Sequence, residues 1–361
     1  MPADRISESN TVPTRAELPR VTIVILARNA ASTIARTVES VAAQDIFRPG
    51  APVRAAALVV VNGSDDSTGK VATEAWAVAR AHHMHTTDLQ IAELPEAGKA
   101  NAWNGAVHRF SDPATDLFVF LDADVWFEHD RALQQLLAPF AKHPEVIATT
   151  AVGKKDVSTI RSWIYRAVVS RTSTVAYGSD AIPGSCYALR GPFVRTMELP
   201  IAITIEDGFL HAMVVTLQFT DRADPRRLRC VTDVAFVYEP KQSFRELFDH
   251  ERRLIIGGSY NAYAFRHFHE VCRADRPAGS FIMERNVSDA TWIAQLIAAD
   301  RRRGRRWLVP TPYLTRRLRP GAPRPAGIRG LVLVAAATAA DAVVSISANS
   351  FLRSFDGSLT W

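Results

Sequence analysis

Leu117-Phe118-Val119-Phe120-Leu121-Asp122-Ala123-Asp124-Val125-Trp126 is an apolar run that ends in two carboxylates one residue apart. A continuous apolar run rich in Phe and Val predicts a strand buried on both faces, and open α/β sheets bind ligands at the carboxyl ends of such strands. Two carboxylates that reach toward one point suit a hard divalent cation, which can in turn hold phosphate oxygens. Asp122 and Asp124 could equally be turn or helix-capping residues, and this stretch alone leaves both interpretations open.

The chain before this run alternates between strand and helix patterns. Residues 20–27 form a β-branched run, and the apolar residues Ile34, Val38 and Val41 then follow at helical spacing. Because strands that alternate with helices pair in parallel, the pattern predicts a parallel sheet. Further strands are predicted at residues 55–61, 89–94 and 146–152, and a turn with a short strand at 183–191. Further helices are predicted at 70–81, 131–142 and 158–175, and an apolar helical stretch is predicted after the acidic pair Glu206-Asp207, through Leu217.

The composition is that of an ordinary globular protein. With 361 residues, 47% of them hydrophobic and 22% charged, the chain can hold one large α/β domain or two small ones. Residues 1–19 are polar and contain no apolar run typical of a signal peptide, which predicts a disordered cytoplasmic tail. The three cysteines, Cys186, Cys230 and Cys272, are far apart, so neither a disulfide framework nor a metal cluster is indicated. For Cys186, packing is favoured over a nucleophilic role.

The positive charge is concentrated near the carboxyl end of the chain. Residues 301–329 hold ten arginines and no acid, whereas the rest of the chain has 33 basic and 37 acidic residues. The apolar, Ala-rich segment 330–352 follows, interrupted by Asp341, and is about as long as the ~20 residues that cross a bilayer. It could span a membrane, lie in the interface with help from arginines on anionic lipid, or pack as a soluble helix.

Four polar motifs follow the predicted strands in order: Arg28-Asn29, the loop Asn62-Gly63-Ser64-Asp65-Asp66-Ser67-Thr68, the segment Gly98-Lys99-Ala100-Asn101-Ala102-Trp103-Asn104, and Asp122-Ala123-Asp124. The chain has neither a Gly-x-Gly-x-x-Gly nor a Walker-type loop, which argues against a dinucleotide oxidoreductase or a P-loop NTPase. The order and spacing of the four motifs resemble family 2 glycosyltransferases of the GT-A fold. The family loop usually reads Val-Asp-Asp-Gly-Ser-x-Asp-x-Thr, and Val61 and Asn62 replace its two acids here.

The resemblance implies an α/β fold of the GT-A type, with a mixed, mainly parallel central sheet flanked by helices. A GT-A domain is expected over residues 20–260, with a nucleotide-sugar half at 20–126 and an acceptor half at 127–260. Residues 261–361 are expected to form a helical extension, with the basic segment 301–329 and the apolar segment 330–352.

The resemblance also assigns site residues. Asp124, helped by Asp122, would bind Mg²⁺ or Mn²⁺. Asp207 would be the base that takes the proton from the acceptor hydroxyl, with Glu206 as its neighbour. The residues expected to bind the nucleoside-diphosphate sugar are Arg28, Asn62, Ser64, Asp66, Lys99, Asp122, His250 and Arg253.

The last stretch that resembles the family lies at residues 243–257. It is similar to the family pattern Thr-x-x-x-x-x-x-Gln-x-x-Arg-Trp-x-x-Gly, and His250 and Leu254 stand where the pattern has Gln and Trp. Arg253 is retained and could pair with a diphosphate. In processive polysaccharide synthases that Trp supports the growing polymer, so its loss favours single transfer.

The function implied is metal-assisted single displacement, with inversion, from a nucleoside-diphosphate sugar to a lipid-linked or glycan acceptor. The expected setting is cell-envelope or exopolysaccharide biosynthesis, in the cytoplasm or peripherally at the inner face of the cell membrane. The enzyme alternative is a sugar-phosphate nucleotidyltransferase, which is disfavoured because Ala27-Arg28-Asn29-Ala30-Ala31 lacks glycine. The non-enzyme alternative is a membrane- or nucleic-acid-binding protein that uses residues 301–329. The apolar segment next to that patch makes an anionic membrane surface the better partner, and no nucleic acid is expected.

Overall fold

The computed structural model describes residues 18–83, 85, 87–160, 162, 163, 165, 166, 181–318 and 327–354. Three predictions fall wholly or partly outside these residues. They are the disordered tail, most of the helix expected over residues 158–175, and the part of the arginine-rich segment at 319–326.

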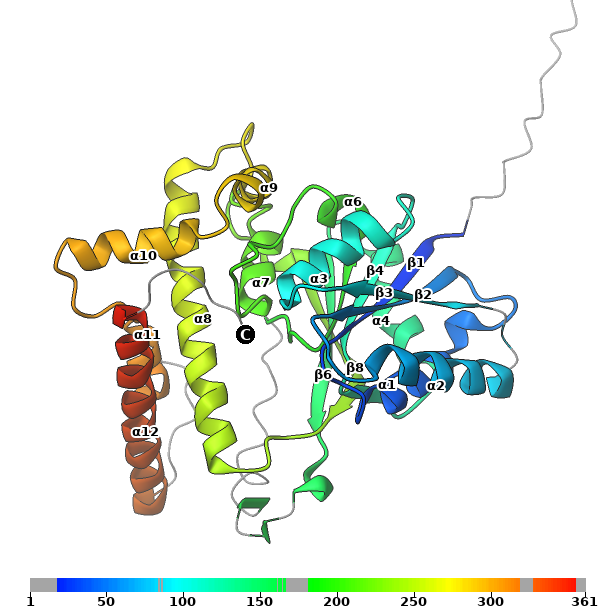
Figure 1. Cartoon of the computed structure of the whole chain (residues 1–361), viewed down its shortest axis with the longest axis horizontal. Helices are drawn as coiled ribbons and strands as arrows, with labels where there is room; N and C mark the ends of the chain where they lie inside the picture. The colour runs from blue at the N-terminus through cyan, green and yellow to red at the C-terminus, as the bar shows by residue number, and fades with distance from the viewer. Residues whose placement is uncertain are drawn as a thin grey trace, which may run out of the picture.

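A single eight-stranded sheet forms the centre of the molecule (Figure 1), in the order β3-β2-β1-β4-β7-β6-β8-β5. Its strands are β1 Arg20–Ala27, β2 Arg54–Asn62, β3 Leu89–Leu94, β4 Leu117–Asp122, β5 Val125–Phe127, β6 Ala148–Lys155, β7 Cys186–Arg190 and β8 Leu228–Tyr238. β1 pairs in parallel with β2 and β4, β2 with β3, and β6 with β8, whereas β7 is antiparallel to β4 and β6, and β5 is antiparallel to β8. The prediction of a mixed, mainly parallel sheet is confirmed.

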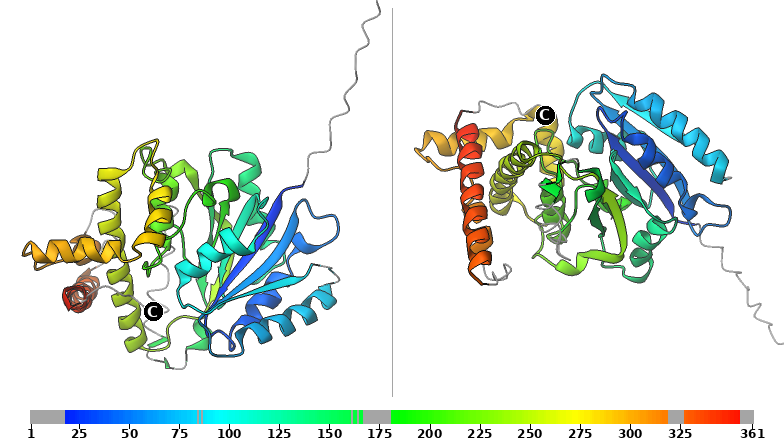
Figure 2. Two further views of the ribbon diagram at one scale, coloured as in Figure 1. Left: turned by 45° about the horizontal axis from the view of Figure 1, so that its top comes forward. Right: turned by 90° about the horizontal axis from the view of Figure 1, so that it is seen from below.

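The helices are α1 Ile34–Ala42, α2 Thr68–His83, α3 Lys99–Gly105, α4 Ala132–Lys142, α6 Gly191–Val194, α7 Asp207–Val215, α8 Phe244–Val271, α9 Ala278–Ser288, α10 Trp292–Arg302, α11 Pro312–Thr315 and α12 Gly327–Ser354. They cover both faces of the sheet (Figure 2). Side chains alternate along a strand, so β4 sends Val119 and Leu121 into the core beneath α1, α2 and α4, and Phe118 and Phe120 into the core beneath α3, α7 and α8. β4 is therefore buried on both faces, as predicted.

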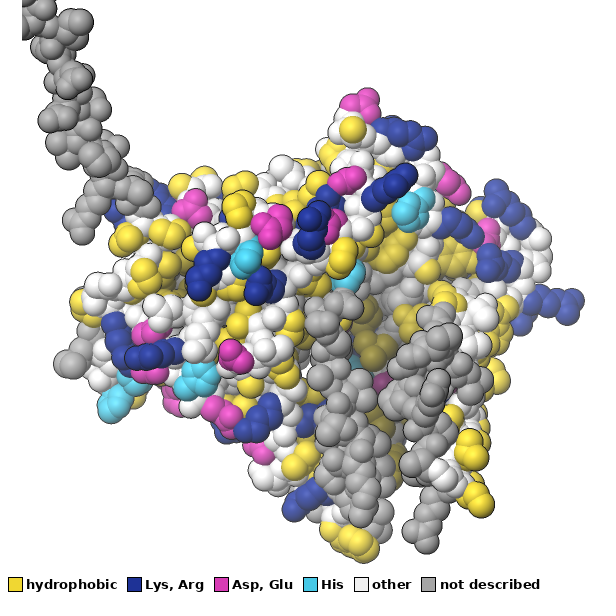
Figure 3. Space-filling model, turned by 180° about the vertical axis from the view of Figure 1, so that it is seen from behind, with side chains coloured by type: hydrophobic (Ala, Val, Ile, Leu, Met, Phe, Trp, Pro, Cys, Tyr) yellow, Lys and Arg dark blue, Asp and Glu magenta, His cyan; other side chains and the backbone are white. Residues whose placement is uncertain are grey.

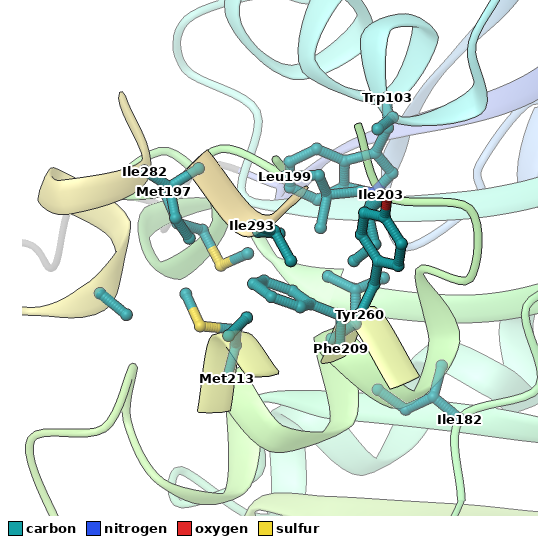
Figure 4. Packing of buried hydrophobic residues seen from close by; sticks show 14 of the residues in the cluster. Trp103, Ile182, Met197, Leu199, Ile203, Phe209, Met213, Tyr260, Ile282 and Ile293 are labelled. Carbon is teal, nitrogen blue, oxygen red and sulfur yellow. The ribbon is translucent and has the colours of Figure 1, made fainter. Parts of the chain in front are cut away.

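The second core joins the sheet to the carboxyl-terminal helices. Figure 4 shows Trp103 of α3, Phe209 and Met213 of α7, Tyr260 of α8 and Ile293 of α10 converging in it, and all of them are at most 2% exposed. The domain boundary predicted between residues 260 and 261 falls within α8, which runs unbroken from Phe244 to Val271. The helical extension therefore shares one core with the sheet.

The beginning of α8 is determined by its sequence. The Ser243 hydroxyl accepts a hydrogen bond from the backbone N–H of Glu246, and it also bonds the Glu246 carboxylate. The Glu246 carboxylate also accepts a hydrogen bond from the Gln242 backbone N–H at 3.0 Å, so this is a variant of the capping box in which the carboxylate reaches the residue before the N-cap. Farther along α8, Gly257 lies against Thr204 and Ile205, and the Asn261 amide donates to the Ile205 carbonyl at 3.1 Å, so this part of the helix lies beside the segment that precedes α7.

Candidate active site

The two acids of Asp122-Ala123-Asp124 lie at the turn from β4 to β5. β4 ends at Asp122, whose backbone N–H donates to the Ser185 carbonyl at 3.1 Å. That bond continues the pairing of β4 with β7 and fixes the turn against the residues just before β7. Cys186 lies directly beneath, fully buried, and burial raises the pKa of its thiol far above the ordinary value. Cys186 therefore stays protonated, as suits the packing role expected for it.

Lys99 connects the two acidic regions that the sequence separates. Its ammonium lies 2.5 Å from Asp122 Oδ1 and 2.5 Å from Glu206 Oε1, and donates to the Gly184 carbonyl at 3.1 Å. Burial by itself lowers the pKa of an ammonium, but Asp122 and Glu206 reverse this and raise the pKa of Lys99 well above its ordinary value. Lys99 therefore stays charged between the two carboxylates.

Glu206 and Asp207 lie at the amino terminus of α7, which begins at Asp207. Burial, followed by the charge of Glu206, raises the pKa of Asp207 to about 6. A hydrogen bond from the Gly208 backbone N–H to Asp207 Oδ1, at 2.6 Å, opposes this rise. A Cβ on Gly184 would lie 3.1 Å from Glu206 Oε1, so glycine allows the loop before β7 to approach the pair closely. Asp207 has the pKa of a general base that works near neutral pH.

Asp122 and Asp124 have the chemistry of a divalent-cation site. Asp124 is accessible to water yet closely surrounded by protein, and burial followed by the charge of Asp122 raises its pKa. A divalent cation would relieve this repulsion, and carboxylate oxygens are its preferred ligands, so the residues present fit the metal. Among the described residues, no group of three or more His, Cys, Asp or Glu side chains could hold a metal ion. Other ligands, such as phosphate oxygens and water, would have to complete the coordination.

A pocket of about 620 Å³ lies over the carboxyl ends of β1, β2 and β3. Its lining comprises Arg28, Asn29, Val61, Gly63, Ser64, Asp65, Asp66, Gly69, Glu93, Leu94 and Pro95. Three predicted donor-binding residues, Arg28, Ser64 and Asp66, are in this lining. Asn62 is 4% exposed and is not among the described lining residues, whereas its neighbour Val61 is. Strand alternation turns the two side chains to opposite faces of β2.

Ser64 and Asp66 also hold the loop after β1 in place. The Asn29 backbone N–H donates to Ser64 Oγ at 3.0 Å, and the Ala31 backbone N–H donates to an Asp66 carboxylate oxygen at 3.0 Å. Asn29 has a positive φ of 47°, which these contacts support. The two predicted binding residues therefore shape the pocket as well as line it.

His250 and Arg253 both lie on α8. Burial, followed by the charges of Lys241 and Arg253, lowers the pKa of His250, so its ring is neutral at pH 7. Arg253 is exposed, and among the described residues no hydrogen bond or ion pair joins it to the carboxylates around Lys99. The structure thus brings together Lys99, Asp122, Asp124, Glu206 and Asp207, and it places Arg253 outside that cluster.

Two further residues at the site were not predicted. Lys241, just before α8, is close enough for its charge to lower the pKa of Asp124. Tyr313 of α11 comes from the arginine-rich segment, and a Cβ on Gly258 would lie only 1.6 Å from its hydroxyl oxygen. Burial, followed by the charge of Asp207, raises the pKa of Tyr313. No local pattern marks either residue, because each reaches the site through the packing of distant helices.

Comparisons with known proteins give one matching family and similar solved structures. The model of the family described as Glycosyl transferase family 2 matches residues 22–194. Among solved structures, the chain is similar to the mannosyltransferase PcManGT from Pyrobaculum calidifontis in complex with GDP-Man and Mn²⁺, at 18% identity and a TM-score of 0.55, over 93% of this chain and 88% of that one. It is also similar to glucosyl-3-phosphoglycerate synthase from Mycobacterium tuberculosis, at 17% identity and a TM-score of 0.46, over 67% and 80% of the two chains. No curated protein matches the chain significantly.

The fold is therefore that of GT-A-like glycosyltransferases, as the likeness to PcManGT shows. The matched segment is a family 2 glycosyltransferase domain, and both the family and the enzyme class expected from the motifs are confirmed. This result favours glycosyl transfer over the nucleotidyl-transfer alternative.

Proposed function

We propose that the chain transfers a hexosyl group from a nucleoside-diphosphate sugar to an acceptor hydroxyl by a single displacement that inverts the anomeric carbon. The observation that carries this proposal is the position of Asp207, whose pKa is raised to about 6. Its neighbour Glu206 is joined through the Lys99 ammonium to Asp122, the first acid of the Asp122–Asp124 pair. A base for the acceptor and a binding site for the leaving group thus occupy two sides of one cluster.

The donor would bind with its nucleotide in the 620 Å³ pocket and its diphosphate toward Asp122 and Asp124. The PcManGT complex contains GDP-Man and Mn²⁺, which supports this class of donor and Mg²⁺ or Mn²⁺ as the metal. A cation bound to Asp124 and Asp122 would neutralise charge that develops on the departing diphosphate. Lys99, which stays charged, adds a fixed positive charge at the same place.

The chain's own residues supply the proton transfer. Asp207 accepts the proton of the acceptor hydroxyl while the new bond forms between that oxygen and the anomeric carbon. The bond between the anomeric carbon and the diphosphate oxygen breaks in the same step. Glu206, held by Lys99 at 2.5 Å, raises the pKa of Asp207 and so increases its strength as a base. Inversion follows because the two bonds lie on opposite faces of the sugar.

The acceptor is a glycan or a lipid-linked molecule in this proposal, and a single sugar is added. Leu254 is partly buried on α8 where processive relatives carry a Trp, which supports non-processive transfer. The proposed setting is cytoplasmic synthesis of a cell-envelope or exopolysaccharide glycan.

A donor screen tests the proposal. GDP-mannose and UDP-glucose are incubated with the full chain and Mn²⁺ or Mg²⁺, and nucleoside-diphosphate release is measured with and without a chelator. We expect metal-dependent release that falls at least about 100-fold in Asp207→Asn and in Asp124→Asn. Asp130→Asn, which alters a partly exposed acid paired with Arg48, is the matched control and should retain activity. Unchanged turnover in both site variants would refute the assignment.

A further inference from the structure

Among the side chains of α12 that the structure describes, one exposed face carries no charge from Ile328 to Ser350. The outer face of α12 is defined here by Ile328, Leu331, Val332, Ala335, Ala336, Ala339, Ala340, Val343, Ile346 and Ser350. Spacings of three and four residues place these side chains on one side of the helix. Five of them are large and highly exposed: Ile328 at 81%, Leu331 at 58%, Val332 at 61%, Val343 at 58% and Ile346 at 59%. Contiguous exposed apolar surface of this kind marks an interaction site.

The opposite face of α12 carries polar side chains that are committed to the protein. Asp341 accepts hydrogen bonds from Arg316 at 2.6 and 3.0 Å and from Arg317 at 2.7 Å. Asn349 accepts from the Leu308 backbone N–H at 2.7 Å and donates to the Arg306 carbonyl at 3.1 Å. Asp341 and Asn349 lie eight residues apart and therefore face the same way.

These contacts separate the three possibilities that the sequence left open. Residues 330–354 are long and apolar enough to cross a membrane by length and composition. A span would have to break the Asp341 and Asn349 bonds and bury a carboxylate in lipid, which is costly. Packing as an ordinary soluble helix would leave the outer face of α12 bare. The third possibility is that α12 stays packed on α8 and lies along a membrane surface. It explains both the bonded polar side chains on one face of α12 and the exposed apolar side chains on the other.

Charge identifies the kind of interface. Arg301 donates to the Arg353 carbonyl at 2.7 Å, so the basic end of α10 lies at the carboxyl end of α12. Viewed from behind, basic side chains gather on the side of α10, with hydrophobic side chains below them on the side of α12 (Figure 3). The exposed arginines there are Arg302, Arg303, Arg305, Arg306 and Arg353. Clustered arginines beside an apolar helical face suit anionic lipid headgroups, and they disfavour a second copy of the same basic chain.

We propose that the outer face of α12 lies flat on an anionic lipid bilayer, with its apolar side chains at the acyl boundary and these arginines on the lipid phosphates. This attachment is independent of the proposed glycosyl transfer. It would bring the site near an acceptor held in the same membrane.

Vesicle sedimentation of the full chain tests the proposal. Vesicles of phosphatidylcholine with about 30% phosphatidylglycerol should bind the chain at least about tenfold more tightly than phosphatidylcholine alone, and less tightly as salt rises from about 0.1 to about 0.5 M. Val343→Glu/Ile346→Glu should weaken binding at least about tenfold. The matched control is Val78→Glu/Val287→Glu, which alters side chains that are 71% and 91% exposed on α2 and α9 and should bind like the parent. Equal far-ultraviolet dichroism and melting temperature show that each variant is folded.

Other outcomes overturn the proposal. Failure to bind the anionic vesicles, or unchanged binding of Val343→Glu/Ile346→Glu, would exclude this face. Protein that resists extraction by alkaline carbonate would span the bilayer. Conversion of a dimer to a monomer by the same double substitution, with vesicle binding retained, would assign the face to a second copy of the chain.

Discussion

Lys99 Nζ lies 2.5 Å from Asp122 Oδ1, so it pairs with one of the two acids proposed to bind the metal. The ammonium also lies 2.5 Å from Glu206 Oε1, so two carboxylates hold it. Because the Lys99 ammonium offsets the charge of Asp122, Asp124 attracts a metal ion more strongly than Asp122 does. A divalent cation that takes few protein carboxylates usually takes phosphate oxygens as well. We therefore expect the metal to bind together with the nucleotide.

Metal binding in the absence of nucleotide should respond to Lys99. Lys99→Gln removes the competing charge, so Mn²⁺ alone should bind at least about tenfold more tightly than to the parent chain. The same variant should lose transfer activity, because the fixed positive charge at the diphosphate is gone. Titration calorimetry measures the first effect, and nucleoside-diphosphate release measures the second. Lys70→Gln, at an exposed lysine of α2, is the matched control. Unchanged Mn²⁺ affinity in Lys99→Gln would show that the ammonium does not compete.

The pH dependence of transfer should follow Asp207. Its pKa is raised to about 6, and only the unprotonated carboxylate can accept a proton, so kcat/KM should fall about tenfold per pH unit below pH 6 and level off above it. Glu206 contributes to the rise through its charge, so Glu206→Gln should move the acidic limb to lower pH. The comparison uses pH–rate profiles of the parent and the variant with one donor. An acidic limb that stays in place in Glu206→Gln would assign it to another group.

The sequence predicted the central sheet because its signals are local. The apolar runs that became β1 and β4 ended where the polar motifs began, within a residue of the observed bounds. The boundary predicted at residue 260 lies inside α8 for a related reason. The family pattern ends at Gly257, whereas α8 continues to Val271 because Tyr260, Ala264 and Phe268 keep its buried face apolar. A motif boundary therefore does not mark the end of a helix.

The sequence motifs named candidate site residues, but they did not predict which of these side chains contact one another. Asp122, Asp124 and Asp207 were found through motifs, but the Lys99 bridge to Glu206 joins α3 to the start of α7 and leaves no trace in local spacing. Tyr313 is the clearest case, since a residue in an arginine-rich segment gives no indication that it lies against Gly258. Such contacts depend on tertiary packing, which periodicity does not encode.

The contact between Tyr313 and Gly258 can be tested by a double-mutant cycle. A Cβ on Gly258 would lie 1.6 Å from the Tyr313 hydroxyl oxygen and 2.7 Å from Cζ, so Gly258→Ala must displace the ring. We expect a loss of about 1–3 kcal/mol in the free energy of unfolding. In the Tyr313→Ala background the same substitution should cost much less, because its clash is gone. Urea unfolding of the four chains gives the coupling energy. A coupling near zero would mean that α11 does not pack against α8 in this way.

The ion pairs of Asp341 should stabilise α12 in a pH-dependent way. Burial opposes ionisation of this carboxyl, but hydrogen bonds from Arg316 and Arg317 lower its pKa below the ordinary 3.8. The stabilisation is therefore present at neutral pH and is lost as the pH falls through the lowered pKa. Asp341→Asn should cost about 1–3 kcal/mol at pH 7, a moderate value because both arginines are partly exposed and Arg316 also pairs with Glu251 at 2.8 Å.

Urea unfolding near neutral pH and again at about pH 3 measures this effect, and the difference between the parent and Asp341→Asn should shrink in acid. Asp233→Asn, at an exposed acid of β8, should match the parent at both pH values. A difference that stays constant with pH would mean that Asp341 acts through its shape and hydrogen bonds. If the charge of Asp341 holds this side of α12 against the protein, the difference in unfolding free energy should shrink in acid. Protonation of the Asp341 carboxyl then removes the charge from the parent chain, as the substitution does from the variant.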